Sequence, residues 1–274
     1  MTNFSNEYNS SDRGSLAFEE LFALIRYRGL VIQLVKRDLI SRYKRSVLGV
    51  AWTLLNPLGT MLILTLVFSA LFNSVQGYPI YLLSGLIAWN FFAQTSSATL
   101  NQNIWGSSLL HRIYLPRTAF SISTLGTGLV NFVLTIFLLI FIIVVIGFHF
   151  HITILFVPVA ILLLSMFTLG FSLLFSTLAI YFPDVVDMFQ VVLSAWMYLT
   201  PIFYPEEIIP MPLRTWLLGL NPMYYFIQLF RLPVYDGVIP SSQLILISFG
   251  IALITLLIGW SVFTSKSNEL TYRT

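Results

Sequence analysis

Two long stretches of the chain carry no formal charge. Residues 46–111 and residues 118–183 contain no Lys, Arg, Asp or Glu, so each uncharged run is 66 residues long. A transmembrane helix needs about 20 apolar residues, and a charge at its centre costs about 2.5–3.5 kcal/mol on insertion scales. Each run is therefore long enough for two spans and a turn. Two shorter uncharged runs, 188–205 and 237–265, each fit one more span.

The predicted fold is an all-α integral membrane protein with six transmembrane helices. Because 57% of the residues are hydrophobic and only 9% are charged, the composition excludes an ordinary soluble domain. We expect one six-span domain over residues 47–265. Its spans are predicted at 47–72, 80–100, 119–146, 153–181, 186–203 and 241–263.

The distribution of cations predicts the orientation. Twelve of the 14 Lys and Arg residues precede the first span, lie between spans two and three, or follow the sixth span. With six spans, these twelve fall on one side of the membrane, and only Arg214 and Arg231 fall on the other. Cytoplasmic loops carry the excess of cations, so both termini are predicted to be cytoplasmic.

The regions before and after the spans are polar or amphipathic. Residues 1–15 and 266–274 are predicted to be cytoplasmic tails, the first of them disordered. Residues 16–46 are predicted to form amphipathic helices that lie at the membrane surface. The apolar side of the second of these helices is formed by Ile32, Val35, Leu39 and Tyr43.

The segment between spans five and six, residues 204–240, is predicted to be external. It contains six prolines, yet its sequence WLLGLNPMYYFIQLF (216–230) is too apolar for a solvated loop. Since there is no room for two further spans, we expect short re-entrant helices that enter the outer part of the membrane. Within the spans, Pro57 and Pro158 are expected to kink their helices.

The spans lack the groups that most chemistry requires. Apart from Asp187 at the start of the fifth span, they carry no Asp, Glu, Lys, Arg or His, so we expect neither a proton relay nor an ion site. The chain has no Cys, and His111, His149 and His151 lie in predicted loops without a carboxylate at ligand spacing. We therefore predict no catalytic residues, no metal site, no cofactor of its own and no enzyme activity.

A nucleotide-binding loop is also missing, because no GxxxxGK[ST] motif occurs. If transport is active, ATP and Mg²⁺ must bind a separate ATPase that pushes on a cytoplasmic surface. The connection 101–117 has an apolar and a basic side, as in a helix that docks into a groove. A plain interfacial loop explains its spacing equally well. The candidate docking residues are Leu109, Leu110, His111, Arg112, Ile113, Tyr114 and Arg117.

Uncharged polar side chains are dense on the second span. Hydrogen bonds between helices are the default role of such groups, whereas a watery path is the alternative that their density suggests. The residues concerned are Asn90, Gln94, Thr95, Ser96, Ser97 and Thr99.

Aromatic residues are abundant, with 24 Phe, 13 Tyr and 6 Trp. Tyr and Trp commonly form interfacial belts, but several of these residues lie deeper than a belt requires. Aromatic faces with a few hydroxyls would let sugar rings slide without strong binding. The hypothesis of an aromatic channel involves Tyr81, Trp89, Phe91, Phe92, Trp196, Tyr198, Phe203, Tyr224 and Tyr225.

Several segments resemble the type-2 ATP-binding-cassette exporter permeases, in the branch that exports O antigens, capsules and teichoic acids. The resemblance covers nearly the whole chain from about residue 30, and the order and spacing of its segments make it specific. They are RDLISRYKRSVLGVAWTLLNPLGTMLILTLVFSALF (37–72), SGLIAWNFF (84–92), YLPR (114–117), IYFPDVVDMFQVVLSAWMYLTPIFYPEEIIP (180–210) and LNPMYYFIQLFR (220–231).

The resemblance implies a permease subunit in a bacterial inner or plasma membrane. Two copies would assemble as a homodimer with two ATPase subunits and export a lipid-linked polysaccharide. Residues 101–117 would be the coupling helix. Arg42, Lys44 and Arg45 would contact the lipid pyrophosphate, although attraction to membrane lipid headgroups explains the same cations.

Two alternatives remain open at this stage. A permease of the same family could export a drug or a simple lipid. An ATP-independent channel or carrier is disfavoured by the charge-free spans. Nothing in the sequence indicates a nucleic-acid partner.

Overall fold

The structure is a computed structural model that describes residues 16–44, 49, 51–72, 75–105 and 117–273. In this part of the chain every regular element is a helix, which confirms the all-α prediction. The elements are α1 (Leu16–Arg26), α2 (Arg28–Tyr43), α3 (Ala51–Phe68), α4 (Tyr78–Trp105), α5 (Arg117–Ile146), η3 (Ile152–Phe156), α6 (Val157–Tyr181), α7 (Val185–Leu199), η4 (Glu206–Ile208), α8 (Leu213–Gly219), α9 (Pro222–Arg231), η5 (Leu232–Asp236) and α10 (Ser242–Arg273).

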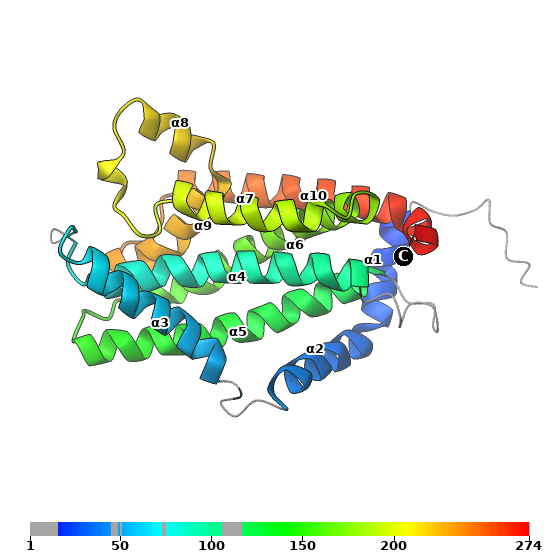
Figure 1. Cartoon of the computed structure of the whole chain (residues 1–274), viewed down its shortest axis with the longest axis horizontal. Coiled ribbons are helices and arrows are strands. Elements are labelled where there is room, and N and C mark those ends of the chain that lie inside the picture. Colours follow the sequence, from blue (N-terminus) through cyan, green and yellow to red (C-terminus); the bar gives the residue numbers. More distant parts are fainter. Residues whose placement is uncertain (1–15, 45–48, 50, 73–74, 106–116, 274) are drawn as a thin grey trace, which may run out of the picture.

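The long helices form an elongated bundle (Figure 1). Helices α4, α5, α6, α7 and α10 run along its length, and α3 crosses in front of α4 and α5. We call the end that holds α1 and the last turns of α10 the terminal end. The opposite end, which holds the segment 200–241 with α8 and α9, is called the loop end.

Four of the described helical segments are long and apolar enough to cross a membrane by length and composition. They are Ala51–Phe68, Arg117–Ile146, Ile152–Tyr181 and Ser242–Lys266. The predicted spans 80–100 and 186–203 correspond to α4, which is long but more polar, and to α7, which is apolar but short. The count of six spans therefore stays a prediction.

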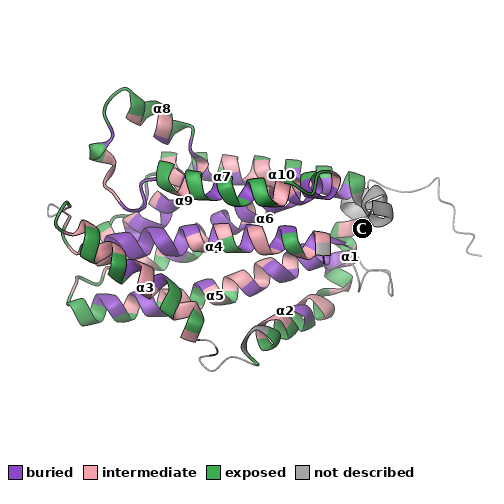
Figure 2. Cartoon of the chain, viewed as in Figure 1, coloured by how far each residue is buried: buried purple, intermediate pink, exposed green. Residues whose placement is uncertain are grey.

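Helix α4 lies at the centre of the bundle. It contacts α3, α5, α6, α7 and α9, and its loop-end half is almost fully buried (Figure 2). The outward faces of the neighbouring helices are apolar and exposed, as at Leu66, Val144 and Leu246. In lipid such faces meet a solvent as apolar as themselves, so exposure does not destabilise them.

Helices α6 and α10 pack closely because two glycines face each other. A Cβ atom on Gly170 would overlap the backbone of Thr255 and Leu256, and one on Gly259 would overlap the carbonyl of Gly170. Small residues let transmembrane helices approach at backbone distance and gain van der Waals contact. This contact fixes α10 against α6, although α7 and the whole loop end lie between these two helices in the sequence.

The loop end is built from the short helices that the sequence predicts. Asn221 joins α7 to α9: its Oδ1 accepts from the Met223 backbone N–H at 3.1 Å and from Trp196 Nε1 at 2.8 Å. Its Nδ2 donates to Thr200 Oγ1 at 2.9 Å. Asn221 thus caps α9, since it satisfies an N–H that has no partner inside the helix.

Two local expectations differ from the structure. Pro158 does not interrupt a helix, because it lies in the first turn of α6, where its missing N–H has no intrahelical partner to lose. Helix α2 packs on α5, where Val35 lies beside Gly126; Leu34 is buried, whereas Ile32 is 54% exposed. Pro57 lies inside α3, as expected.

Candidate functional site

One side of α4 packs into a cluster of aromatic rings with α6 and α7. The Trp196 ring centroid lies 6.0 Å from that of Trp89 and 5.4 Å from that of Phe92. Phe171 of α6 completes the cluster, 5.2 Å from Phe92 and 5.6 Å from Trp196. Trp89 and Phe92 are 2% and 0% exposed. These rings hold α4, α6 and α7 together.

The nine aromatics of the channel hypothesis are placed very differently. Tyr198 is 69% exposed, whereas Trp196, Tyr224 and Tyr225 are half-buried. The other five are buried within the single chain: Tyr81, Trp89, Phe91, Phe92 and Phe203. A channel formed between two copies lies beyond a single chain, so the channel-lining role stays a prediction.

Arg231 of α9 is a buried residue that the sequence analysis missed. It is 2% exposed, and its Nη1 donates to the Tyr81 hydroxyl at 3.0 Å and to the Pro201 carbonyl at 2.9 Å. Its Nη2 donates to the Ile202 carbonyl at 3.2 Å, and the guanidinium lies 3.8 Å from the Tyr81 ring centroid. Arg231 thereby ties α9 to α4. The available signal was its setting in the apolar sequence QLFRLPV.

The second loop-end cation, Arg214 of α8, has a more exposed partner. Its Nη2 lies 2.7 Å from Glu206 Oε1, and Glu206 Oε2 accepts from the Tyr224 hydroxyl at 2.6 Å. This cluster joins η4, α8 and α9 on the outside of the bundle.

Asn103 joins three helices at the terminal end. Its Nδ2 donates to Ser121 Oγ of α5 and to Ser176 Oγ of α6, each at 3.0 Å. All three side chains are buried. The site lies three residues before the segment 106–116, which connects α4 to α5, so one amide joins three helices close to this connection.

The predicted ATPase-docking region is only partly described. Residues 101–105 continue α4 rather than beginning a separate coupling helix. Leu109, Leu110, His111, Arg112, Ile113 and Tyr114 lie outside the described residues. Arg117 begins α5 and is 6% exposed, with Glu20 of α1 among the charges near it. Arg117 is therefore buried in this single chain, and its docking role stays a prediction.

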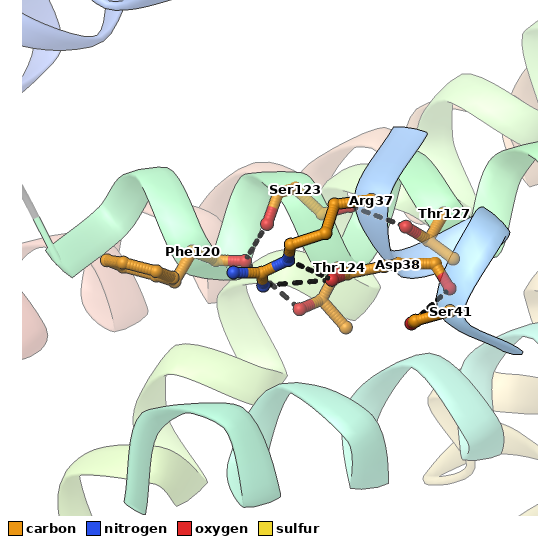
Figure 3. A network of polar contacts seen from close by, with 7 residues as sticks. All are labelled: Arg37, Asp38, Ser41, Phe120, Ser123, Thr124 and Thr127. Atoms are coloured by element: carbon orange, nitrogen blue, oxygen red, sulfur yellow. Dashed lines mark hydrogen bonds and ion pairs between the residues drawn. The ribbon is translucent and has the colours of Figure 1, made fainter. Parts of the chain in front are cut away.

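The predicted pyrophosphate-binding cations lie at or just after the end of α2. Lys44 is exposed, whereas the side chain of Arg42 and the whole of Arg45 lie outside the described part of the chain. Their role stays a prediction. About two turns before the end of α2, Arg37 forms an ion pair of 2.9 Å with Asp38, next to α5 (Figure 3).

The other side of α4 borders a polar groove of about 280 Å³. Helices α4 and α5 form its two long walls, while α2 and α3 contribute Asp38, Ser41, Thr53 and Pro57. Asn90, Gln94 and Thr95 line it, as a polar path predicts. The neighbouring Ser96 instead accepts a hydrogen bond from Ser172 of α6 at 3.2 Å. The polar residues of α4 are thus divided between the groove and helix contacts.

Comparison with known proteins places this arrangement in a family. Residues 29–235 match the family model of the ABC-2 type transporters, which includes α2 to α9 and almost all of η5.

The chain belongs to the ABC-2 type transporter family.

Relatives in this family match over nearly their whole length. The chain is 28% identical to the O-antigen export system permease protein RfbA of Myxococcus xanthus, over 90% of this chain and 95% of that protein. It is 28% identical to RfbA of Klebsiella pneumoniae, over 89% and 93%. It is 25% identical to the polysialic acid transport protein KpsM of Escherichia coli, over 85% and 92%. The protein is thus a multi-pass membrane permease.

Proposed function

We propose that the chain is the transmembrane subunit of an ATP-driven exporter of lipid-linked polysaccharide. The observation that carries this proposal is its similarity to permeases named for O-antigen export and for polysialic acid transport, over 85–90% of its length. The polar groove and the aromatic residues beside α4 are compatible with a carbohydrate cargo.

The energy source in this proposal is a separate ATPase. Since no GxxxxGK[ST] motif occurs in the sequence, ATP and Mg²⁺ bind the partner. The partner contacts the connection 106–116, and two copies of the permease assemble with two ATPase subunits. Asn103, three residues before this connection, joins α4 to α5 and α6, and this supports the assignment of the connection as the coupling segment.

The terminal end is the cytoplasmic end in this proposal, and the membrane is a bacterial inner or plasma membrane. Helices α1 and α2 carry the cations Arg26, Arg28, Lys36 and Arg37, whereas Arg214 and Arg231 belong to the loop end. This asymmetry agrees with the positive-inside rule and with six spans.

Two measurements test the proposed function. Cells that lack the chain should accumulate lipid-linked glycan on the cytoplasmic side and lose the surface polysaccharide, and a plasmid copy should restore it. Normal surface glycan in the deletion strain, together with loss of resistance to a drug, would favour efflux instead.

The second measurement is co-purification. A tagged permease should retain an ATPase in mild detergent, and Leu109→Glu with Leu110→Glu should release it, because two charges disrupt an apolar docking face. Gln243→Glu, an exposed change at the loop end, is the control. Retention of the ATPase by the double variant would contradict the docking assignment.

A further inference from the structure

The groove beside α4 is long, and its lining repeats with helical spacing. On α4 it extends from Ile87 to Gln102, a distance of about 22 Å at 1.5 Å per residue. On α5 it extends from Thr124 to Thr135. Because α5 returns antiparallel to α4, these two faces oppose each other along most of the groove.

The groove presents both donors and acceptors. Within the described part of the chain, the side-chain amides of Asn90, Gln94 and Gln102 have no hydrogen-bond partner. The hydroxyls of Thr124 and Thr127 donate to the carbonyls of Phe120 and Ser123, at 3.0 and 3.1 Å. A hydroxyl that donates to its own helix keeps its acceptor lone pairs for a ligand.

The charge of the groove restricts the ligand. Asp38 is the one charged residue in the lining that the described residues provide, and it is paired with Arg37 at 2.9 Å. Figure 3 shows this pair and Ser41 beside Thr124 and Thr127 of α5. A phosphate needs cations or converging backbone N–H groups, and the described residues of the lining include no Lys or Arg. A neutral ligand rich in hydroxyl groups fits better.

The apolar surface and the volume of the groove restrict the class of ligand further. Phe91 and Phe132 also line the groove, with ring centroids 5.0 Å apart. Amides, hydroxyls, one carboxylate and an aromatic surface together match a sugar ring, which has polar edges and an apolar C–H face. A volume of about 280 Å³ is near the lower limit for ligand pockets, about 300 Å³, and suits one sugar residue rather than a polymer.

We propose that this groove, walled by α4 and α5 and closed by α2 and α3, is a binding site for a single sugar residue. The proposal rests on the proposed function, in that the sugar belongs to the exported glycan. The site lies within one chain and differs from a channel between two copies. Occupancy holds the glycan beside α4, the helix that leads directly into the coupling connection.

The cysteine-free sequence gives a direct test of occupancy. Gln94→Cys places one thiol in the groove, and Gln243→Cys places one on an exposed turn outside it. Each variant is purified with its ATPase, in nanodiscs that leave both membrane faces open. The rate of alkylation by a small maleimide is measured with glucose, N-acetylglucosamine or mannose, and with glycerol or inorganic phosphate as controls.

We expect at least one sugar to slow alkylation at Gln94→Cys by about tenfold when its concentration is ten times the dissociation constant. Glycerol and phosphate should have no such effect, and Gln243→Cys should be unaffected throughout. No protection by any sugar, or equal protection by glycerol or phosphate, would overturn the proposal. A thiol at position 94 that the reagent cannot reach would also overturn it, because such a groove is closed to a sugar.

An export assay separates this inference from the proposed function. The double variant Asn90→Leu with Gln94→Leu keeps the side-chain size and removes four hydrogen-bonding groups. It should lower glycan export at least tenfold while the purified complex keeps its ATPase, whereas Gln243→Leu should export normally. Normal export by the double variant would refute the sugar site alone. Absence of glycan export by the wild type would refute the proposed function. In that case the alkylation of Gln94→Cys would still show whether the groove binds a sugar.

Discussion

The two sides of α4 differ in how closely neighbouring side chains pack against them. Toward α6 and α7 the helix presents Trp89 and Phe92 to other rings, and both side chains are buried. Toward α5 it presents Asn90 and Gln94 to a groove that other helices border but do not fill. Residues only one or two positions apart therefore have opposite roles, one holding the bundle together and the other free to bind. Mutations on the two sides should separate stability from transport.

The largest loss of stability is expected from Trp89→Ala. Removing this ring leaves a cavity among Phe92 and Trp196, and such changes destabilise by about 3–5 kcal/mol. The melting temperature of the purified complex should fall strongly. Tyr198→Ala, on an exposed ring, should melt like the wild type. If Trp89→Ala kept its melting temperature but lost export, Trp89 would be a channel residue rather than a packing residue.

Arg231→Leu should have the next largest effect. It leaves two carbonyls and the Tyr81 hydroxyl without their charged donor, and a hydrogen bond of a charged group contributes about 1.5–3 kcal/mol. Arg214→Leu is the matched control, since it breaks a partly exposed ion pair that contributes about 0–1 kcal/mol. Equal melting temperatures for the two variants would show that Arg231 does not hold α9 to α4.

Asn103→Ala tests the polar contact at the terminal end. Hydrogen bonds between membrane helices average about 0.6 kcal/mol, so losing two of them predicts a loss of about 1 kcal/mol. The more specific expectation is functional. The variant permease should stimulate the ATPase much less than the wild type does, although its melting temperature falls only slightly. Unchanged stimulation would remove Asn103 from the coupling route.

Thr124→Val should have the smallest effect on stability. It removes one hydroxyl that bonds to its own helix, a loss of about 0.6 kcal/mol, and keeps the side-chain volume. Thermal unfolding should be nearly unchanged. A large destabilisation would mean that the groove side of α4 and α5 is packed as tightly as the aromatic side.

Charge and hydropathy predicted the helical fold, because hydrocarbon excludes charges and requires every backbone group to bond within a helix. The placement of short helices between α7 and α10 also followed from composition. The sequence could not show which aromatic residues are buried, since that depends on contacts such as Trp89 with Trp196, 107 positions apart. Arg231 was missed for the same reason: its partners are Tyr81 and the carbonyls of Pro201 and Ile202.

The most direct test of the account is transport by the purified protein. Proteoliposomes that contain the permease and its co-purified ATPase should move fluorescently labelled lipid-linked glycan across the bilayer when ATP is added. Proteoliposomes with the permease alone should not. Accumulation of glycan against its gradient by the permease alone would contradict the central claim that this chain depends on a separate ATPase.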